Sequence, residues 1–598
     1  MDTYQLLLNP TIEALIQDDP IFKKTEDELD YHKFRQITFE RLGKIIQTGL
    51  INSFEIVNNP TNFLSVMNTL HAYDLSLAVK TGVNFGLFGA GLLRLGHYDQ
   101  VKNYVNKLNI GQIFGSLAIT EIGHGSNLKQ LETTATWDSQ ICCFLLNTPT
   151  HTAKKCWIGN AACHATHAIV FAQLIFNKEN KGLHPFIVQL RDQHKQLTYG
   201  IEIEDNGYKK GLNGVDNGMI AFRNVIISRE SLLSNFGFVD IQGKYICSFT
   251  DPNKRFGEIL STLSGGRGVL ASGANIVSLK ALKIACQYAL LRKQFSINNN
   301  IEQPIISYTS HQLKLIPLLI KSLALNEVLQ YIRQEGITEF KREGKVTKKL
   351  HAFTSGIKVL CTEHAEKCCR ISRLACGGHG YAWNNELSRM HNDIDIYQTF
   401  EGDNTLLRLE VFKYKLLRLQ EYVNQNEYGQ TLYALKMMTS QKIMMIRTFL
   451  FGIYRSNDID HILALLKYKE KYMTLDLLTE LKNYIDNGMT PLEAGNKCQD
   501  LVSKVADSYI QRKVYETLLN KCHEKYNFKL LFGLELLKKD SEWYLIKDIL
   551  NKDQVKEIQV LRKKLCHEIT DDLPTLLETI PFEKSFIDVP LTMFFFKN

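Results

Sequence analysis

The strongest constraint on the fold is a change in hydrophobic periodicity that occurs twice along the chain. From about residue 10 to 110, apolar residues recur at helical spacing, as at Phe39, Leu42, Ile45, Ile46 and Leu50. Between about 114 and 240 the pattern becomes short β-rich runs separated by turn signals such as Asp-Asn-Gly. Helical periodicity resumes at Ser264 and persists almost to the end. The sequence therefore predicts a small β domain between helical blocks.

The β-rich region and the helical regions together set the expected domains. We expect strands over Gln140–Leu146, Ala168–Leu174, Phe186–Leu190, Gly200–Ile203 and Met219–Ile227. The segment Val269–Leu291 is apolar nearly all round, which is typical of a helix at the centre of a bundle. A chain of 598 residues is too long for one core. We predict an α+β protein with an N-terminal α domain (1–113), a middle β barrel or sandwich (114–255), a helical bundle (256–425) and a second C-terminal α domain (426–598).

Composition and the N-terminus narrow the class of protein. The start of the chain has no basic region followed by an apolar run, so no secretory signal is seen. The best membrane candidate, Gly82–Leu93, has about half the length that spans a bilayer. The 13 cysteines include no C-x-x-C and are interpreted as free thiols in a reducing compartment. A soluble intracellular protein is expected, and its net charge of +8 is too modest to imply nucleic acid.

One carboxylate, Glu401, lies in a turn just before an amphipathic helix. Asp403 or Asn404 is well suited to cap that helix, and Gly402 allows another group to approach the backbone closely. A carboxylate held there against apolar walls is a candidate catalytic base. The alternative is a solvated loop glutamate, and the residues of this turn alone do not exclude it.

Four motifs in order resemble those of the flavin-dependent acyl-CoA oxidases, relatives of the acyl-CoA dehydrogenases. They are Ala118-Ile-Thr-Glu-Ile-Gly-His-Gly-Ser-Asn127 with Leu131-Glu-Thr-Thr-Ala-Thr136, then Lys155-Cys-Trp-Ile-Gly-Asn-Ala161, then Arg373-Leu-Ala-Cys-Gly-Gly-His-Gly-Tyr381, and the turn Thr399-Phe-Glu-Gly-Asp-Asn404. The resemblance runs from about residue 60 to 420, and the order of helical and β regions extends it to nearly the whole chain.

The resemblance implies FAD as cofactor and assigns residues to it. The implied flavin contacts are Thr120, Ser126, Trp157, Ile158, Gly159, Arg292, Phe295, His311, Gln312, Gly377 and Gly378. Arginine suits the pyrophosphate of the cofactor. The paired glycines would contact flavin across a dimer interface, which implies at least a homodimer. The implied substrate contacts are Ser126, Arg267 and Gly402.

The resemblance also implies the reaction, which is α,β-desaturation of an acyl-CoA to the trans-2-enoyl-CoA in fatty acid β-oxidation. Glu401 would take the α-proton, and the thioester carbonyl would accept a hydrogen bond from its backbone N–H. Some dehydrogenase relatives place their base just before an arginine on an earlier helix. The matching residue here is Gly266, before Arg267, so no carboxylate competes. In an oxidase, O2 takes the electrons and hydrogen peroxide is released.

Several alternatives stay open at this point. An acyl-CoA dehydrogenase would pass the electrons to a flavoprotein carrier, although Leu374 replaces the glutamine usual there in dehydrogenases. A nucleic-acid-binding relative of the fold is disfavoured by the near-balanced charge of residues 431–598. A flavin-free scaffold is a third alternative. No metal is expected, because His124, His164, His167 and His379 are interpreted as structural.

The expected location depends on the source of the chain. The C-terminal Phe-Phe-Lys-Asn is not a peroxisomal tripeptide, and the family's alternative N-terminal signal is absent. We expect a cytoplasmic protein if the source is bacterial, and otherwise peroxisomal import that depends on a partner.

Overall fold

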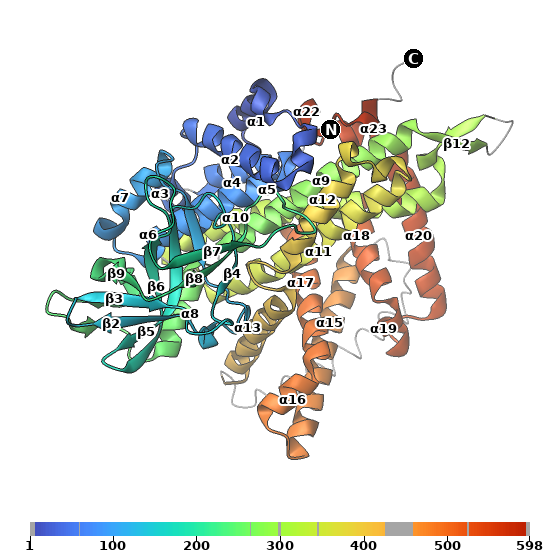
Figure 1. The fold of residues 1–598 in the computed structure, drawn as a ribbon. Helices are drawn as coiled ribbons and strands as arrows, with labels where there is room; N and C mark the ends of the chain where they lie inside the picture. The colour runs from blue at the N-terminus through green and yellow to red at the C-terminus, as the bar shows by residue number, and fades with distance from the viewer. Residues whose placement is uncertain are drawn as a thin grey trace. The chain divides into compact units, whose positions relative to one another are not determined.

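The computed structural model describes residues 6–58, 60–263, 265–296, 301–343, 346–424, 459–522 and 525–593. The chain divides into two compact units, Leu7–Val269 and Leu270–Asn598. The first unit holds the N-terminal helices and the main β sheets, and the second is mostly helical (Figure 1). This is the predicted order of a helical region, a β region and further helices. The division into four domains stays a prediction.

The N-terminal part of the first unit is helical, as predicted. Its helices are α1 (Pro10–Asp18), α2 (Tyr31–Gln47), α3 (Ser53–Asn58), α4 (Pro60–Tyr73), α5 (Leu75–Thr81), α6 (Ala90–Leu95) and α7 (Tyr98–Asn109). Helices α5 and α6 are joined without a break by η3 (Gly82–Gly89), a stretch of π-helix. Such wider turns are rare in proteins and often occur at functional sites.

The β region of the first unit contains two main sheets. The larger has the order β1 (Gly115–Ala118), β5 (His167–Phe176), β2 (Thr134–Asp138), β3 (Cys143–Asn147), β9 (Val225–Ser228), with β6 (Glu179–Gln189) also paired to β5. The smaller has the order β4 (Lys155–Ile158), β8 (Gly218–Phe222), β7 (Ile201–Asp205). A hairpin of β10 (Phe238–Val239) and β11 (Tyr245–Ile246) follows. One apolar core, including Phe144, Phe186 and Phe222, lies among these strands.

Three expectations about element boundaries were wrong for local reasons. The predicted strand 219–227 is two strands, because Asn224 adopts a left-handed φ of 48° between β8 and β9. The predicted strand 140–146 begins only at Cys143, because Asp138 accepts the N–H of Gln140 in a turn (2.8 Å). The helical part resumes at α8 (Pro252–Leu263), earlier than Ser264, because Asp251 caps it and proline suits its first position.

The second unit is built from long helices. They are α9 (Gly266–Leu291), whose first residues still belong to the first unit, then α10 (Thr309–Glu343), α11 (Lys348–Ala375), α12 (Leu387–Ile394), α13 (Asn404–Asn424), α15 (Ile459–Asp486), α16 (Pro491–Lys497), α17 (Gln499–Lys521), α18 (Tyr526–Lys539), α19 (Ser541–Ile546), α20 (Lys552–Asp571), α21 (Leu573–Glu578), α22 (Lys584–Ile587) and α23 (Pro590–Met593). A short hairpin of β12 (Lys293–Ser296) and β13 (Glu302–Pro304) separates α9 from α10. Most of α9 is buried, as its apolar sequence predicts.

Three helical segments are long and apolar enough, by length and composition alone, to cross a membrane. They are Leu75–Leu95, Pro252–Leu291 and Thr309–Glu339, and 78%, 89% and 72% of their most apolar windows are buried inside the protein. The expectation that the first of these was too short was wrong, because α5 before Gly82 and the end of α6 after Leu93 continue the helix without a break. Packing within the protein already accounts for the apolar character of all three.

Candidate active site

The Glu401 turn in the second unit has an unusual backbone. Glu401 has φ of 57° and Gly402 has φ of 100°, so two consecutive residues adopt left-handed conformations. For a residue other than glycine this conformation costs about 1 kcal/mol. The ring of Tyr397, just before the turn, is fully buried and lies 4.9 Å from the ring of Phe400. The strained glutamate therefore follows a firmly packed aromatic anchor.

Hydrogen bonds from two helices hold this turn in place. The carboxylate of Asp403 accepts the N–H of Thr405 (2.8 Å), so of the two predicted caps, Asp403 and Asn404, it is Asp403 that caps α13. The buried ammonium of Lys358, on α11, donates to the carbonyl of Gly402 (2.9 Å) and to Oδ1 of Asn404 (3.0 Å). The backbone on the C-terminal side of Glu401 is thereby tied to α11.

Glu363, a carboxylate on α11 that contacts Asn404, is engaged in an ion-pair network. It lies 2.8 Å from the guanidinium of Arg408, which also pairs with Asp507 at 2.7 Å. The amide of Asn404 donates to Glu363 as well (3.4 Å). Glu363 is thus a structural group. Gly266, the alternative base position, begins α9 and is followed by half-buried Arg267.

Trp157 in the first unit has an exposed ring on a left-handed backbone. Its φ is 62° and it is 59% exposed, although it belongs to strand β4. The pairing of β4 with β8 is irregular between Lys155 and Ile158, and this bulge turns the indole outward. Ile158 is buried, so the two predicted flavin residues face opposite ways.

The predicted flavin residues Thr120 and Ser126 belong to the segment that follows β1. The carbonyl of Thr120 accepts the N–H of Cys156 (2.9 Å), so this segment lies directly beside the one that carries Trp157. Ser126 is exposed at the end of the same loop. The first unit therefore brings two of the predicted flavin motifs together.

Gly159 packs closely against the N-terminal helices. A Cβ there would lie 3.1 Å from Cγ2 of Val83, which is on the π-helix η3, so a larger residue would require Val83 to shift by a few tenths of an ångström. The resemblance alone assigned this glycine to close contact with flavin. Packing within the chain therefore also favours a small residue at this position.

The predicted residues for the ADP part of FAD cluster around the β12–β13 hairpin in the second unit. Arg292 directly follows α9, and its carbonyl accepts the N–H of Ile305 (2.8 Å). Phe295 is 76% exposed with φ of 55°. His311 and Gln312 lie in the first turn of α10, and Gln312 is buried.

The imidazole of His311 has an unsatisfied atom. Its Nε2 is buried and has no hydrogen-bond partner among the described residues. Burial, assisted by Lys314, lowers the pKa of His311 to about 4, so the ring is neutral at pH 7. A buried polar atom without a partner is rare in proteins and often marks a place where a ligand binds.

The paired glycines Gly377 and Gly378 follow the end of α11 and are exposed. Gly377 has φ of 58°, which favours glycine. Gly378 has φ of −62°, and a Cβ there would meet nothing within 4 Å. The described part of the chain therefore gives no steric or conformational reason for glycine at position 378.

His124 has closer acidic neighbours than the sequence spacing indicated. Oxygens of Glu121 and Glu132 lie 3.8 and 3.6 Å from its Nδ1, which is a possible arrangement for a metal ion. The oxygens of Glu121, however, already accept from Thr133 and from the ammonium of Lys155 (2.9 Å). These contacts account for Glu121, whereas the buried Nδ1 of His124 has no hydrogen-bond partner among the described residues. The absence of a metal from the site stays a prediction.

Sequence reasoning missed the buried lysines Lys80, Lys155 and Lys358, which hold the predicted site segments. Lysine is normally a surface residue, so each appeared to be an ordinary solvated charge. Lys80 offered a signal, since it is the one charged residue between Leu75 and Gly91. Lys155 stands at the start of a recognised motif but had no assigned role.

Comparison with known proteins places the fold and these motifs in one class. Residues 260–416 match the model of the acyl-CoA oxidase C-alpha1 domain, and residues 116–225 match that of the acyl-CoA dehydrogenase middle domain. The chain is 31% identical over 594 residues to the peroxisomal acyl-coenzyme A oxidase 2 of Arabidopsis thaliana, covering 95% of this chain and 85% of that protein. The chain therefore belongs to the acyl-CoA oxidase family.

Solved structures of similar proteins agree with this membership. The crystal structure of acyl-CoA oxidase 1 from Yarrowia lipolytica is 25% identical with a TM-score of 0.84, covering 98% of this chain and 88% of that one. Acyl-CoA oxidase 2 of Caenorhabditis elegans, solved with FAD, ascaroside-CoA and ATP, is 20% identical with a TM-score of 0.81, covering 98% and 87%. The predicted fold class is confirmed by these similarities.

Proposed function

We propose that the protein is an FAD-dependent acyl-CoA oxidase in fatty acid β-oxidation. It would convert an acyl-CoA to the trans-2-enoyl-CoA, with O2 reduced to hydrogen peroxide. Family membership supports the activity. The observation that supports the assignment of the base is the Glu401 turn, where a strained glutamate is held at the start of α13 by Asp403 and Lys358.

The residues of this chain fit FAD as the cofactor. The exposed indole of Trp157 offers a flat apolar surface to a ring system. The unsatisfied Nε2 of His311 can accept or donate a hydrogen bond, and Gly378 leaves room for close approach. Arg292 would hold the pyrophosphate. When bound, FAD supplies the acceptor for the hydride from the substrate β-carbon and later delivers the electrons to O2.

Glu401 is the proposed base for the α-proton. Loss of that proton places negative charge on the thioester oxygen, which the backbone N–H of Glu401 would stabilise. The N-terminal end of α13 adds a favourable dipole for this charge. The left-handed backbone sets the direction of both the carboxylate and the N–H, so the strain serves to orient them.

The first experiment tests the cofactor and the electron acceptor. The purified protein should show a flavin spectrum, and anaerobic titration with acyl-CoAs of graded chain length should bleach it. Admission of air should restore the colour and release one peroxide per enoyl-CoA. A protein that cannot be reconstituted with FAD would refute the proposal. Reoxidation only by an added flavoprotein carrier would indicate a dehydrogenase.

The second experiment tests the base. Glu401→Gln should retain FAD but slow anaerobic bleaching by about 10²- to 10⁴-fold, which is the typical contribution of a general base. The matched control is Glu410→Gln on α13, the helix that follows the turn, where the half-buried carboxylate pairs with Lys413. Normal bleaching in Glu401→Gln would place the base elsewhere.

A homodimer and a peroxisomal location complete the proposal. The exposed glycines Gly377 and Gly378 would allow a second copy, with its flavin, to approach closely. The Arabidopsis relative is named as peroxisomal. Light scattering with and without FAD tests the first point, and imaging of a tagged chain in its own cells tests the second.

A further inference from the structure

The segment that carries Trp157 has a strained backbone that requires external support. Trp157 and Asn160 have φ of 62° and 67°. Asparagine tolerates this conformation, but a bulky tryptophan disfavours it. We call residues 156–160 the Trp157 turn. Such strain persists only where the surroundings over-determine the backbone, and two buried lysine–carboxylate pairs provide that here.

The first pair, Lys155 with Glu121, lies immediately before the turn. Both side chains are completely buried and their atoms are 2.9 Å apart. Lys155 also donates to the carbonyls of Ile119 (3.0 Å) and Phe171 (2.7 Å), which uses all three of its N–H groups. Glu121 accepts the N–H of Thr133 (2.9 Å). One ammonium thus joins β4 to the segment that carries Thr120.

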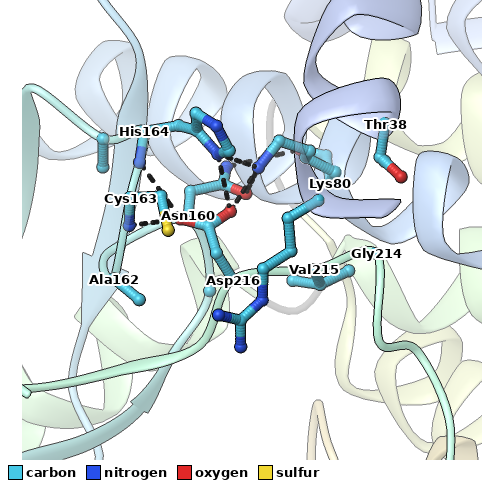
Figure 2. Close-up of polar contacts among 12 residues, drawn as sticks. Thr38, Lys80, Asn160, Ala162, Cys163, His164, Gly214, Val215 and Asp216 are labelled. Atoms are coloured by element: carbon cyan, nitrogen blue, oxygen red, sulfur yellow. Dashed lines mark hydrogen bonds and ion pairs between the residues drawn. The ribbon is translucent and has the colours of Figure 1, made fainter. Parts of the chain in front are cut away.

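The second pair, Lys80 with Asp216, lies immediately after the turn (Figure 2). Lys80 forms an ion pair with Asp216 and donates to Oδ1 of Asn160 (3.2 Å). Asp216 accepts the N–H groups of Cys163 (2.8 Å) and His164 (3.1 Å). The amide of Asn160 donates to the carbonyl of Gly115 (3.2 Å).

His164 completes the hydrogen-bonded cluster around the second pair. Nδ1 of His164 lies 3.1 Å from both Lys80 and Asp216, and its ring stacks on Phe39 at 4.1 Å. Burial alone would raise the pKa of Asp216, but Lys80 and His164 outweigh it and hold that pKa well below its usual range. Asp216 is therefore ionised at pH 7, and the pair persists as a charged contact between α5 and the β region.

We propose that Lys80 and Lys155 are positioning residues that fix the Trp157 turn so that its indole projects outward to meet FAD. This inference rests on the proposed function. Lys155 acts on the chain just before the turn, and Lys80 acts on its last residue through the side chain of Asn160. Removing one partner of a buried pair leaves an uncompensated charge, so the turn should loosen before the unit unfolds.

Hydrogen exchange of the cofactor-free protein tests whether the two lysine–carboxylate pairs support the Trp157 turn. Peptides covering 156–162 should exchange about tenfold faster in Asp216→Asn and in Lys155→Met than in the wild type. The double variant K80M/D216N removes both charges, so it keeps the test valid if a single variant does not fold. The matched control is Glu28→Gln, which breaks the buried pair with Arg41 (2.7 Å) in the same unit. Unchanged exchange in folded variants, or an equal rise in the control, would overturn the proposal.

FAD titration of the same variants tests the consequence for the site. Affinity for FAD should fall about tenfold in Asp216→Asn and Lys155→Met, with an unchanged KM for acyl-CoA once FAD saturates. The control should bind FAD like the wild type. Faster exchange with normal FAD affinity would overturn the link to the cofactor. A wild type that never binds FAD would instead refute the proposed function, and the exchange data would still decide whether the pairs support the turn.

Discussion

At the scale of single residues, two glycines that are adjacent in the sequence have different reasons to be glycine. Gly377 needs its left-handed backbone, whereas Gly378 has an ordinary helical backbone and open space around the missing Cβ. The sequence motif could not separate these reasons, because both appear as the same letters. Trp157 is similar, since only the structure shows that its ring is turned outward.

Alanine at the two positions should therefore have opposite effects. Gly377→Ala should lower the stability by about 1 kcal/mol, because alanine is strained at that φ. Gly378→Ala should leave the melting temperature unchanged or slightly higher, yet weaken FAD binding about tenfold. Thermal melts without FAD and titration with FAD measure the two effects. Unimpaired FAD binding by Gly378→Ala would remove the support for close approach at this position.

At the scale of elements, the sequence predicted what depends on neighbours along the chain. Local patterns in the sequence predicted the order of helical and β regions, a cap at the start of α13, and the buried position of α9. The lysine contacts could not be predicted this way, because Lys80 meets Asp216 and Lys358 meets Gly402 across long stretches of sequence. The division of residues 219–227 into two strands was missed because a single left-handed Asn224 decides it.

The link between helix α11 and the Glu401 turn predicts a defect in catalysis. Lys358→Met removes the donor to the Gly402 carbonyl and to Asn404, so the turn should lose its fixed direction. We expect kcat to fall about 10- to 100-fold while FAD affinity stays normal, since misplaced catalytic groups can lose 10²-fold. The control Lys413→Met alters an exposed lysine of α13. Steady-state peroxide assays measure kcat. Equal kcat values for the wild type and both variants would contradict this reasoning.

At the scale of the whole molecule, burial of histidines ties stability to pH. Burial lowers the pKa of His71 to about 4 and that of His184 to about 3, below the ordinary value of 6.5. Both rings are buried and hydrogen-bonded, His71 to the carbonyl of Met67 and His184 to the hydroxyl of Tyr245 (2.8 Å). On acidification the unfolded chain therefore takes up protons before the folded chain does.

The free energy of unfolding should fall as the pH is lowered from 6.5 towards 4. The contribution of each neutral buried histidine is fully present above pH 6.5 and is lost as the pH falls towards its folded-state pKa. Chemical unfolding at closely spaced pH values measures the slope. His71→Gln, which cannot titrate, should show a shallower slope across this window than the wild type. An equal slope would mean that other groups carry the acid sensitivity.

The π-helical stretch Gly82–Gly89 also sets a limit on how this protein can change during evolution. In a regular α-helix each residue turns the next by roughly 100°, and the wider i→i+5 turns absorb extra residues without that rotation. The stretch therefore sets the rotation about the helix axis between the residues before it and those after it. Lys80, before the stretch, faces Asp216, and Leu92 and Leu95, after it, are buried. Loss of one residue within this stretch would return a wide turn to regular α-helical geometry and keep both faces in phase, whereas a residue added to the regular turns of α5 or α6 would rotate one face away from its partner. Tolerance of a change in length is therefore confined to Gly82–Gly89.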